Sequence, residues 1–240
     1  LELTEPGSAV VYSVPTLFRE YDEAREPPRH VAPVARALEA AADAGAERFV
    51  YLSSTSVYGD HDGAWVDEDV EPAPASPMGK MRRDIEEFVL ERGPAQGVSA
   101  NVARLVGIYG PGRTLVDYLR SGRYRLVDGG TKPTNRIHVD DIVRVLRAIV
   151  ERGPEGARLY NVSDGSPKTA REVVDWAVEH LDVEPPEEIS LEAYADQRGP
   201  NAVARWANTY RVDNTRMVEE LGVAPEYADV FEGYRAIFEL

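Results

Sequence analysis

Hydroxyl side chains gather in one short run of this sequence, Ser53-Ser54-Thr55-Ser56-Val57-Tyr58-Gly59. The run directly follows an apolar segment that is typical of a buried β-strand. At the end of such a strand, hydroxyls can bind the oxygen of a carbonyl or a ribose, but Ser and Thr also cap strand ends without any ligand. A second run, Ser76-Pro77-Met78-Gly79-Lys80-Met81-Arg82, adds cations at the start of a predicted helix. Binding of polar oxygens is one interpretation of these residues, and capping is the other.

The elements that must position these residues are predicted from the spacing of apolar side chains. We expect buried strands over 8–14, 48–54 and 99–106, with helices over 30–45 and 79–92 between them. Strands and helices that alternate at this spacing predict a parallel sheet with helices on both faces. Ligands of such sheets collect at the carboxyl ends of the strands. The candidate cofactor contacts are therefore the residues at these ends: Ser13, Val14, Pro15, Ser53 and Gly107.

The second half of the chain mixes shorter elements. We predict helices over 114–122, 140–152, 169–181 and 214–221, strands over 124–127 and 158–162, and loops over 63–77 and 184–188. Asp140 is the expected N-cap of the second of these helices. Three large aromatic residues are expected to fill the core of a smaller lobe: Trp176, Trp206 and Tyr210.

Composition limits the classes of function. The 240 residues carry a formal net charge of −15 and no cysteine, which excludes disulfide scaffolds, thiolate metal sites and a cysteine nucleophile. An acidic chain lacks the basic face that neutralises phosphates, so we expect no nucleic-acid partner. No apolar run is long enough to cross a membrane, and the acidic start at Leu1–Glu5 does not resemble a signal peptide. We therefore expect a cytoplasmic protein without a membrane partner.

Lysine is rare among the 27 basic residues, because it occurs at Lys80, Lys132 and Lys168 and arginine supplies the rest. Few lysines, many carboxylates and a large negative charge are typical of proteins that stay soluble in concentrated salt, where self-repulsion is screened. We expect a halophilic protein. GC-rich codon usage is the alternative explanation of the arginine excess.

Two further blocks complete a pattern with the two runs above. They are Arg104-Leu105-Val106-Gly107-Ile108-Tyr109-Gly110-Pro111-Gly112 and Asn135-Arg136-Ile137-His138-Val139-Asp140-Asp141. The sequence thereby resembles the extended short-chain dehydrogenase/reductase superfamily, in its NAD-dependent epimerase/dehydratase group. That group carries Ser-Ser-x-x-Val-Tyr-Gly, Ser-Pro-Tyr-Gly-x-x-Lys, Arg-x-x-x-x-Tyr-Gly-Pro and Ile-His-Val-x-Asp in this order, and the agreement covers about residues 8–165. The resemblance implies an α/β fold with a doubly wound, Rossmann-like parallel sheet and a small C-terminal α/β substrate lobe.

The resemblance also implies roles for single residues. Ser54 takes the position of the family's hydroxyl that hydrogen-bonds the reacting oxygen of the substrate. The family's acid/base tyrosine falls at Met78 and its lysine at Arg82. A thioether exchanges no proton and a guanidinium is practically never deprotonated, so the tyrosine–lysine relay is absent. We expect an atypical member in which Arg82 holds the cofactor ribose and Tyr58 is the nearest other phenol.

The motifs with which the family binds sugar nucleotides are altered as well. An asparagine before the Tyr-Gly-Pro turn is replaced by Gly107, and an arginine before the Ile-His-Val motif is replaced by Thr134. The candidate substrate residues are three arginines that can receive an anion: Arg136, Arg198 and Arg205. We expect no metal site, because no second histidine lies near His138 in the sequence.

The family's phosphate-binding loop, Gly-x-x-Gly-x-x-Gly, does not occur in these residues. We therefore expect the first strands of the dinucleotide-binding domain to lie upstream of Leu1. Residues 1–110 are predicted to be the remainder of that domain. Residues 111–240 are predicted to be mainly the substrate lobe, with 135–165 returning to the main sheet.

Two hypotheses about function remain. The first, which we favour, is an enzyme that binds NAD or NADP and performs epimerase-, dehydratase- or reductase-type chemistry on a small polar substrate, for example a sugar derivative, with a non-standard proton transfer. The second is a non-catalytic dinucleotide-binding sensor or scaffold. Met78 favours the second hypothesis, whereas Ser54, Tyr58 and the cation at Arg82 favour the first. A homodimer is an open alternative to a monomer.

Overall fold

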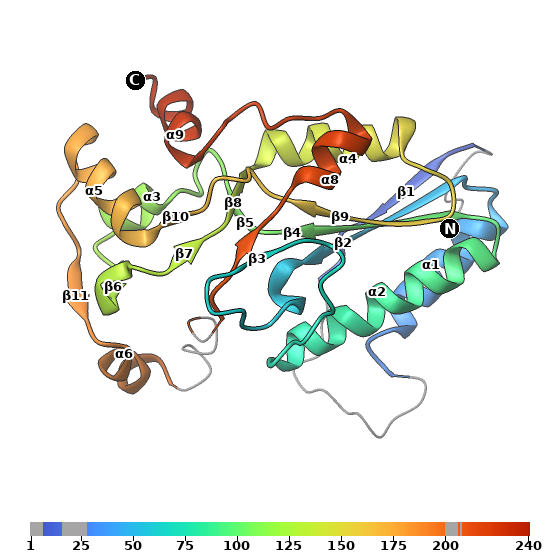
Figure 1. The fold of residues 1–240 in the computed structure, drawn as a ribbon, viewed down its shortest axis with the longest axis horizontal. Helices are drawn as coiled ribbons and strands as arrows, with labels where there is room; N and C mark the ends of the chain where they lie inside the picture. The colour runs from blue at the N-terminus through green and yellow to red at the C-terminus, as the bar shows by residue number, and fades with distance from the viewer. Residues whose placement is uncertain (1–6, 16–27, 200–205, 207) are drawn as a thin grey trace.

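The computed structural model describes residues 7–15, 28–199, 206 and 208–240 (Figure 1). Its main sheet consists of parallel strands in the order β1 (Ala9–Tyr12), β2 (Arg48–Ser54), β4 (Ser99–Leu105) and β9 (Ala157–Val162). The predicted strands are confirmed, although β1 ends two residues earlier than expected. Because the strands run in the same direction, the residues that follow them meet at one edge of the sheet.

Helices cover both faces of this sheet. They are α1 (Ala32–Asp43), α2 (Pro77–Ala95), α4 (Val139–Arg152) and α8 (Thr215–Leu221). Alternate side chains of β2 point to opposite faces, so that Phe49 is buried in a core with α1 and α2, and Val50 in a core with α4 and α8. Figure 1 shows the two helix pairs on opposite sides of the strands. The doubly wound architecture is thus confirmed.

The starts of two helices differ from prediction for local reasons. α2 begins before Gly79, because the Ser76 hydroxyl accepts a hydrogen bond from the Gly79 N–H at 3.0 Å and Pro77 occupies the first helical position, where its missing N–H costs nothing. The prediction of Asp140 as an N-cap is wrong. His138 caps α4, since its Nδ1 accepts a hydrogen bond from the Asp140 N–H at 3.2 Å.

The C-terminal lobe has a core of its own. Its elements are α3 (Leu115–Arg120), β6 (Arg125–Val127), the 3-10 turn η2 (Asp128–Gly130), α5 (Ala170–His180), β11 (Glu187–Ile189), α6 (Leu191–Arg198) and α9 (Val230–Phe238). Trp176 is buried in this core, as predicted. The predicted loop over 184–188 is wrong at its end, because β11 pairs with β6. The exposed Glu187 and Glu188 give this strand no apolar alternation, so sequence periodicity could not reveal it.

Short strand pairs connect distant parts of the chain. They are β5 (Gly107–Tyr109) with β8 (Arg136–His138), β7 (Pro133–Thr134) with β10 (Lys168–Thr169), and β3 (Trp65–Val66) with β12 (Arg211–Val212). β3 lies inside the segment predicted as a loop, and its pairing with β12 corrects that prediction. The chain returns to the main sheet at β9, whereas the division at residue 110 stays a prediction.

Candidate functional site

A cleft of about 220 Å³ opens where β2 and β4 end. One wall comes from the 3-10 turn η1 (Thr55–Val57) that follows β2 and from the junction of β4 and β5. The opposite wall comes from β7, the residue after it and the segment before β12. The lining side chains are hydroxyl, amide or apolar groups: Thr55, Ser56, Val106, Gly107, Pro133, Thr134, Asn135, Asn208 and Tyr210. The cleft therefore lies at the strand edge where the sequence predicts ligands.

The three serines at the end of β2 have different environments. Ser54 is the N-cap of η1, and its hydroxyl oxygen accepts a hydrogen bond from the Ser56 N–H at 3.2 Å. Ser56, two residues later, lines the cleft. Ser53 is 5% exposed, and its hydroxyl has no hydrogen-bond partner among the described residues. The hydroxyl predicted to bind the substrate oxygen thus caps a turn, Ser56 faces the cleft, and the buried Ser53 does not line it.

The first turns of α2 pack directly against η1. A Cβ added at Gly79 would lie 2.9 Å from the Ser56 carbonyl oxygen and 2.7 Å from the Pro74 Cβ, so the helix approaches this closely only with glycine there. One turn further, Arg82 Nη1 donates a hydrogen bond to the Ser56 hydroxyl oxygen at 2.9 Å. Met78 is half-buried in the first turn of α2. The Arg82 cation therefore contacts the cleft through a serine.

Tyr58 is fully buried behind the cleft. Its hydroxyl lies 2.7 Å from Asn161 Oδ1 and 2.8 Å from the Asp67 carbonyl oxygen, so its single proton is engaged by protein acceptors. Burial raises the pKa of Tyr58 to about 12, although the Arg104 guanidinium, 4.7 Å from the ring centroid, acts to lower it. This environment gives Tyr58 neither access to the cleft nor a pKa suited to proton transfer at neutral pH.

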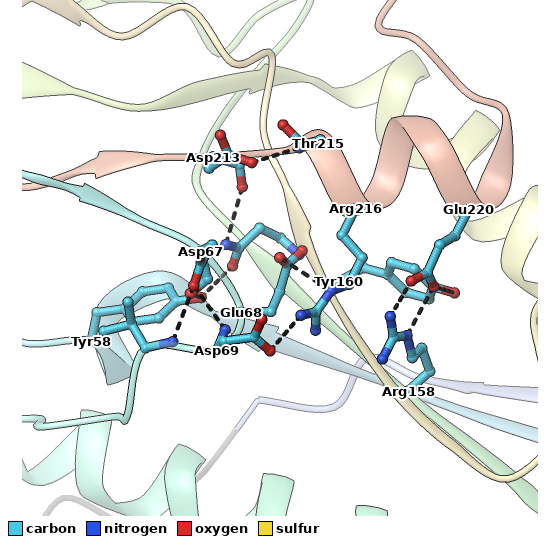
Figure 2. Close-up of polar contacts among 12 residues, drawn as sticks. Tyr58, Asp67, Glu68, Asp69, Arg158, Tyr160, Asp213, Thr215, Arg216 and Glu220 are labelled. Carbon is cyan, nitrogen blue, oxygen red and sulfur yellow. Dashed lines mark hydrogen bonds and ion pairs between the residues drawn. The ribbon is translucent and has the colours of Figure 1, made fainter.

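A polar network joins β9, the loop after β3 and α8, as Figure 2 shows. Glu68 Oε1 accepts a hydrogen bond from the Asn161 N–H at 2.7 Å, and Glu68 Oε2 lies 3.6 Å from Arg216 Nε. Arg216 Nη2 also donates to Asp69 at 2.5 Å, while Arg158 and Glu220 form an ion pair beside them. The network fixes β12 and α8 against the edge of the main sheet.

The segment before β12 carries Tyr210 into the cleft wall. Its hydroxyl donates to the Thr55 carbonyl oxygen at 2.9 Å. Asn135 holds the same segment, because its Nδ2 donates to the Tyr210 carbonyl oxygen at 3.0 Å and its Oδ1 accepts from the Val212 N–H at 2.9 Å. The expectation that Tyr210 fills the core of the smaller lobe is wrong, since it packs against the main core and borders the cleft.

A second polar group follows β9, at Asp164. This residue is 7% exposed; its Oδ1 accepts the Ser166 N–H at 2.9 Å, and its Oδ2 has no partner in the described part of the chain. Burial raises the pKa of Asp164 to about 7, against the lowering effect of the hydrogen bond from Ser166 and of the Arg136 charge. Arg136 itself donates to the Lys168 carbonyl oxygen at 3.1 Å. Arg136 is therefore committed to a contact within the fold and does not line the cleft.

The other predicted contacts are spread over the molecule. Ser13, Val14 and Pro15 are exposed beyond β1. Gly107 lines the cleft, and its N–H donates to the Asn135 carbonyl oxygen at 3.0 Å. Arg198 is exposed at the end of α6, and Arg205 lies outside the described residues. Within residues 7–15, 28–199, 206 and 208–240, no cluster of three or more histidine, aspartate and glutamate side chains is arranged to hold a metal ion.

Sequence reasoning missed most of the far wall of the cleft. Asn135 and Tyr210 are 75 positions apart, and only folding brings them together. The signal for Ser56 was present, because it belongs to the hydroxyl run after β2. Its role depends on α2, which no local pattern places beside η1.

The arrangement of motifs is matched by a family model. The model of the NAD dependent epimerase/dehydratase family matches residues 28–163, which is more than half of the chain. The chain belongs to this family. Within the family, it is 30% identical over 208 residues to the dTDP-glucose 4,6-dehydratase of Streptomyces griseus, covering 83% of this chain and 60% of that protein. It is 26% identical over 186 residues to protein YeeZ of Escherichia coli K12, covering 76% of this chain and 59% of that protein.

Two solved structures superpose on nearly the whole chain. A functionally unknown conserved protein from Silicibacter pomeroyi DSS matches with a TM-score of 0.80 and 32% identity, over 97% of this chain and 77% of that one. MoeE5 in complex with UDP-glucuronic acid and NAD matches with a TM-score of 0.76 and 25% identity, over 96% of this chain and 77% of that one. The chain thus spans about three-fifths of the length of the curated relatives above and about three-quarters of these structures. Among the described helices, none is both long and apolar enough to span a membrane.

Proposed function

We propose that this protein binds NAD or NADP and catalyses a redox step on a small, polar substrate of the sugar-nucleotide type. The observation that carries the proposal is the cleft at the ends of β2 and β4, with hydroxyl and amide groups along both walls. Such groups bind the hydroxyls of a sugar-like ring by hydrogen bonds. Relatives support the same class, since one is named as a dTDP-glucose dehydratase and MoeE5 was solved with UDP-glucose and NAD.

The chemistry of the lining favours reduction or oxidation over elimination of water. Elimination requires a general base that removes a proton from carbon. Among the described residues that line the cleft, none carries a carboxylate, an imidazole or an ammonium group. Hydride transfer to or from a carbon that bears oxygen needs polarisation of that oxygen, which hydroxyls supply. We therefore favour a reductase- or epimerase-type reaction over a dehydratase.

The residues near the cleft fit the nicotinamide and ribose end of the cofactor. The buried Ser53 hydroxyl lacks a described partner, Arg82 has N–H groups beyond the one that it donates to Ser56, and the end of β1 exposes Ser13 and Val14. When bound, the cofactor supplies or accepts the hydride. Ser53 and Arg82 would hold the ribose, and Val14 would cover the apolar face of the ring. Residues near the adenosine ribose determine the choice between NAD and NADP.

The proposal is tested on the full-length protein in concentrated and dilute KCl. NADH and NADPH are titrated by cofactor fluorescence. Turnover of dTDP-glucose, UDP-glucose and UDP-glucuronic acid is then followed by absorbance at 340 nm for net oxidation or reduction, and by chromatography of the sugar nucleotides for epimerisation, which leaves the cofactor unchanged. We expect saturable binding of one cofactor and turnover with at least one sugar nucleotide. Failure of both cofactors to bind would refute the proposal.

A second candidate function is a non-catalytic dinucleotide-binding sensor or scaffold. Met78 favours it, because no phenol occupies the position of the family's acid/base. Binding of cofactor without turnover, combined with no gain of turnover in Met78→Tyr/Arg82→Lys, would favour this candidate. Gain of turnover in that double variant, with a silent wild type, would indicate a binding protein that descends from an enzyme.

A further inference from the structure

We propose that Ser56 is a catalytic residue of this cleft and that Arg82 is its positioning residue. In this arrangement the Ser56 hydroxyl donates a hydrogen bond to the reacting oxygen of the substrate, and Arg82 holds and polarises that hydroxyl. The inference rests on the proposed function and specifies the group that replaces the missing phenol at Met78.

The hydrogen bonds of Ser56 leave its hydroxyl proton available to a ligand. A serine hydroxyl has one proton to donate and two lone pairs that accept. Arg82 Nη1 donates to the Ser56 oxygen at 2.9 Å, and a guanidinium has no lone pair with which to accept a proton in return. The Ser56 proton is therefore not directed at Arg82. It has no acceptor among the residues that the structure describes, and Ser56 lines the cleft, so the proton is available to a ligand there.

Two other hydroxyls of the lining, those of Thr134 and Tyr210, have their protons engaged, whereas the Thr55 oxygen accepts only from the neutral Tyr210 hydroxyl at 3.3 Å. The Thr134 hydroxyl donates to the Lys168 carbonyl oxygen at 2.6 Å, and the Tyr210 hydroxyl donates to the Thr55 carbonyl oxygen at 2.9 Å. Ser56 differs from both because its oxygen accepts from a full positive charge. A hydroxyl that accepts a charge-assisted bond becomes a stronger donor, since hydrogen bonds in a chain polarise one another.

The backbone holds this pair in place from two sides. Ser54 caps η1 by accepting the Ser56 N–H, which fixes the turn on which Ser56 sits. Gly79 lets the first turns of α2 pack against the Ser56 carbonyl group, and Arg82 lies on the same helix one turn later. The donor is thus preorganised before substrate binds, which is the condition under which a single hydrogen bond contributes most to catalysis.

The chemical step balances without a protein acid. A reduced nicotinamide cofactor, bound as proposed above, would supply a hydride with its two electrons to the carbonyl carbon, and negative charge would develop on the carbonyl oxygen. The Ser56 proton stabilises this charge by a hydrogen bond, and a water molecule in the cleft gives the oxygen its proton and leaves as hydroxide, which the solvent neutralises. Arg82 stays protonated throughout, because guanidinium groups are not deprotonated in proteins. Oxidation follows the same path in reverse.

The test compares variants of the full-length protein with the most active sugar nucleotide among dTDP-glucose, UDP-glucose and UDP-glucuronic acid. We expect Ser56→Ala to lower kcat by about 100-fold, as loss of one preorganised donor does, with little change in KM and in cofactor affinity. Ser56→Thr keeps the hydroxyl and is expected to restore most of the rate. Arg82→Met is expected to lower kcat and to weaken cofactor binding, since Arg82 also contacts the ribose in the proposed function. Ser56→Ala/Arg82→Met is expected to be no slower than Arg82→Met, because Ser56 depends on Arg82 for its polarisation.

The chain offers a matched control. Ser121 accepts a hydrogen bond from Arg123 Nε at 3.3 Å on the exposed surface after α3, so Ser121→Ala removes the same kind of Arg–Ser pair away from the cleft. We expect this variant to retain wild-type kcat. Thermal unfolding of each variant checks that it is folded.

The outcomes separate this inference from the proposed function. A folded Ser56→Ala with wild-type kcat would overturn the role of Ser56 while cofactor binding and turnover uphold the proposed function. An equal loss of rate in Ser121→Ala would overturn it as well. A wild-type protein that binds no cofactor, or that binds it and turns over no sugar nucleotide, would overturn both.

Discussion

The buried ion pair between Arg104 and Glu86 offers a sharp test of how α2 is held. Arg104 Nη2 donates to Glu86 Oε2 at 2.7 Å, Nε lies 3.1 Å from the same oxygen, and the side chains are 4% and 3% exposed. Burial acts to lower the pKa of Arg104, but the hydrogen bonds and charge of Glu86 outweigh it and raise that pKa. In Glu86→Leu the guanidinium stays charged and loses its partner in the interior. We expect unfolding free energy to fall by about 3–5 kcal/mol.

The assay is urea unfolding followed by circular dichroism at constant KCl. With a slope of about 2 kcal/mol per molar urea, the midpoint should fall by about 2 M. Glu86→Leu/Arg104→Met removes both charges and should recover most of the loss, because well-packed apolar residues replace buried pairs at little cost. The control is Arg147→Gln, which breaks an exposed pair with Glu151 and should cost about 0.5 kcal/mol or less. A loss below about 1 kcal/mol in Glu86→Leu would refute the argument from burial.

Three further predictions concern pH, backbone and salt. The pKa of Asp164 rises from 3.8 to about 7 on folding, so its contribution to stability is fully present below pH 3.8 and is lost as pH rises to about 7. This loss amounts to about 4 kcal/mol of unfolding free energy. Asp164→Asn should therefore flatten the curve of unfolding free energy against pH over this range. Gly59→Ala should prevent stable folding, because φ is +83° and a Cβ would lie 2.2 Å from the Ala73 carbonyl oxygen, whereas Gly97→Ala, at φ +77° in open space, should cost about 1 kcal/mol in thermal unfolding. Since the net charge is −15, the melting temperature should rise steeply with KCl and the fold should weaken below about 1 M; full stability in dilute buffer would contradict the expectation of a halophilic protein.

Local sequence patterns predicted the main strands and helices correctly, because the spacing of apolar residues reflects which side chains are buried. β2 and β4 are continuous apolar strands flanked by amphipathic helices, and periodicity detects both. The same signal fails for β11 and for the two-residue strands, which bury few side chains and are defined by their partners. Asp140 illustrates a subtler failure, since a good capping residue was displaced by a histidine two positions earlier.

For the candidate site too, some features could be predicted from the sequence and others could not. The hydroxyl run after β2 and the cation on α2 are visible in the sequence because each belongs to one element with a regular pattern. The choice among Ser53, Ser54 and Ser56 is not visible there, because adjacent residues at a strand end turn to different environments. One caps a turn, one is buried without a described partner, and one accepts from Arg82 at the cleft.

The sequence by itself determined the alternation of strands and helices and the family, because these depend on residue type and on spacing along the chain. That Met78 takes the place of the family's phenol stays a prediction. The tertiary structure alone decided that Tyr210 and Asn135 close the cleft, that Tyr58 is buried behind it, and that Arg82 donates to Ser56. Each of these contacts joins residues from different elements, at least 26 positions apart in the two hydrogen bonds of Arg82 and Tyr210. Such contacts are set by how the helices pack on the sheet, and no local pattern of side chains encodes that packing.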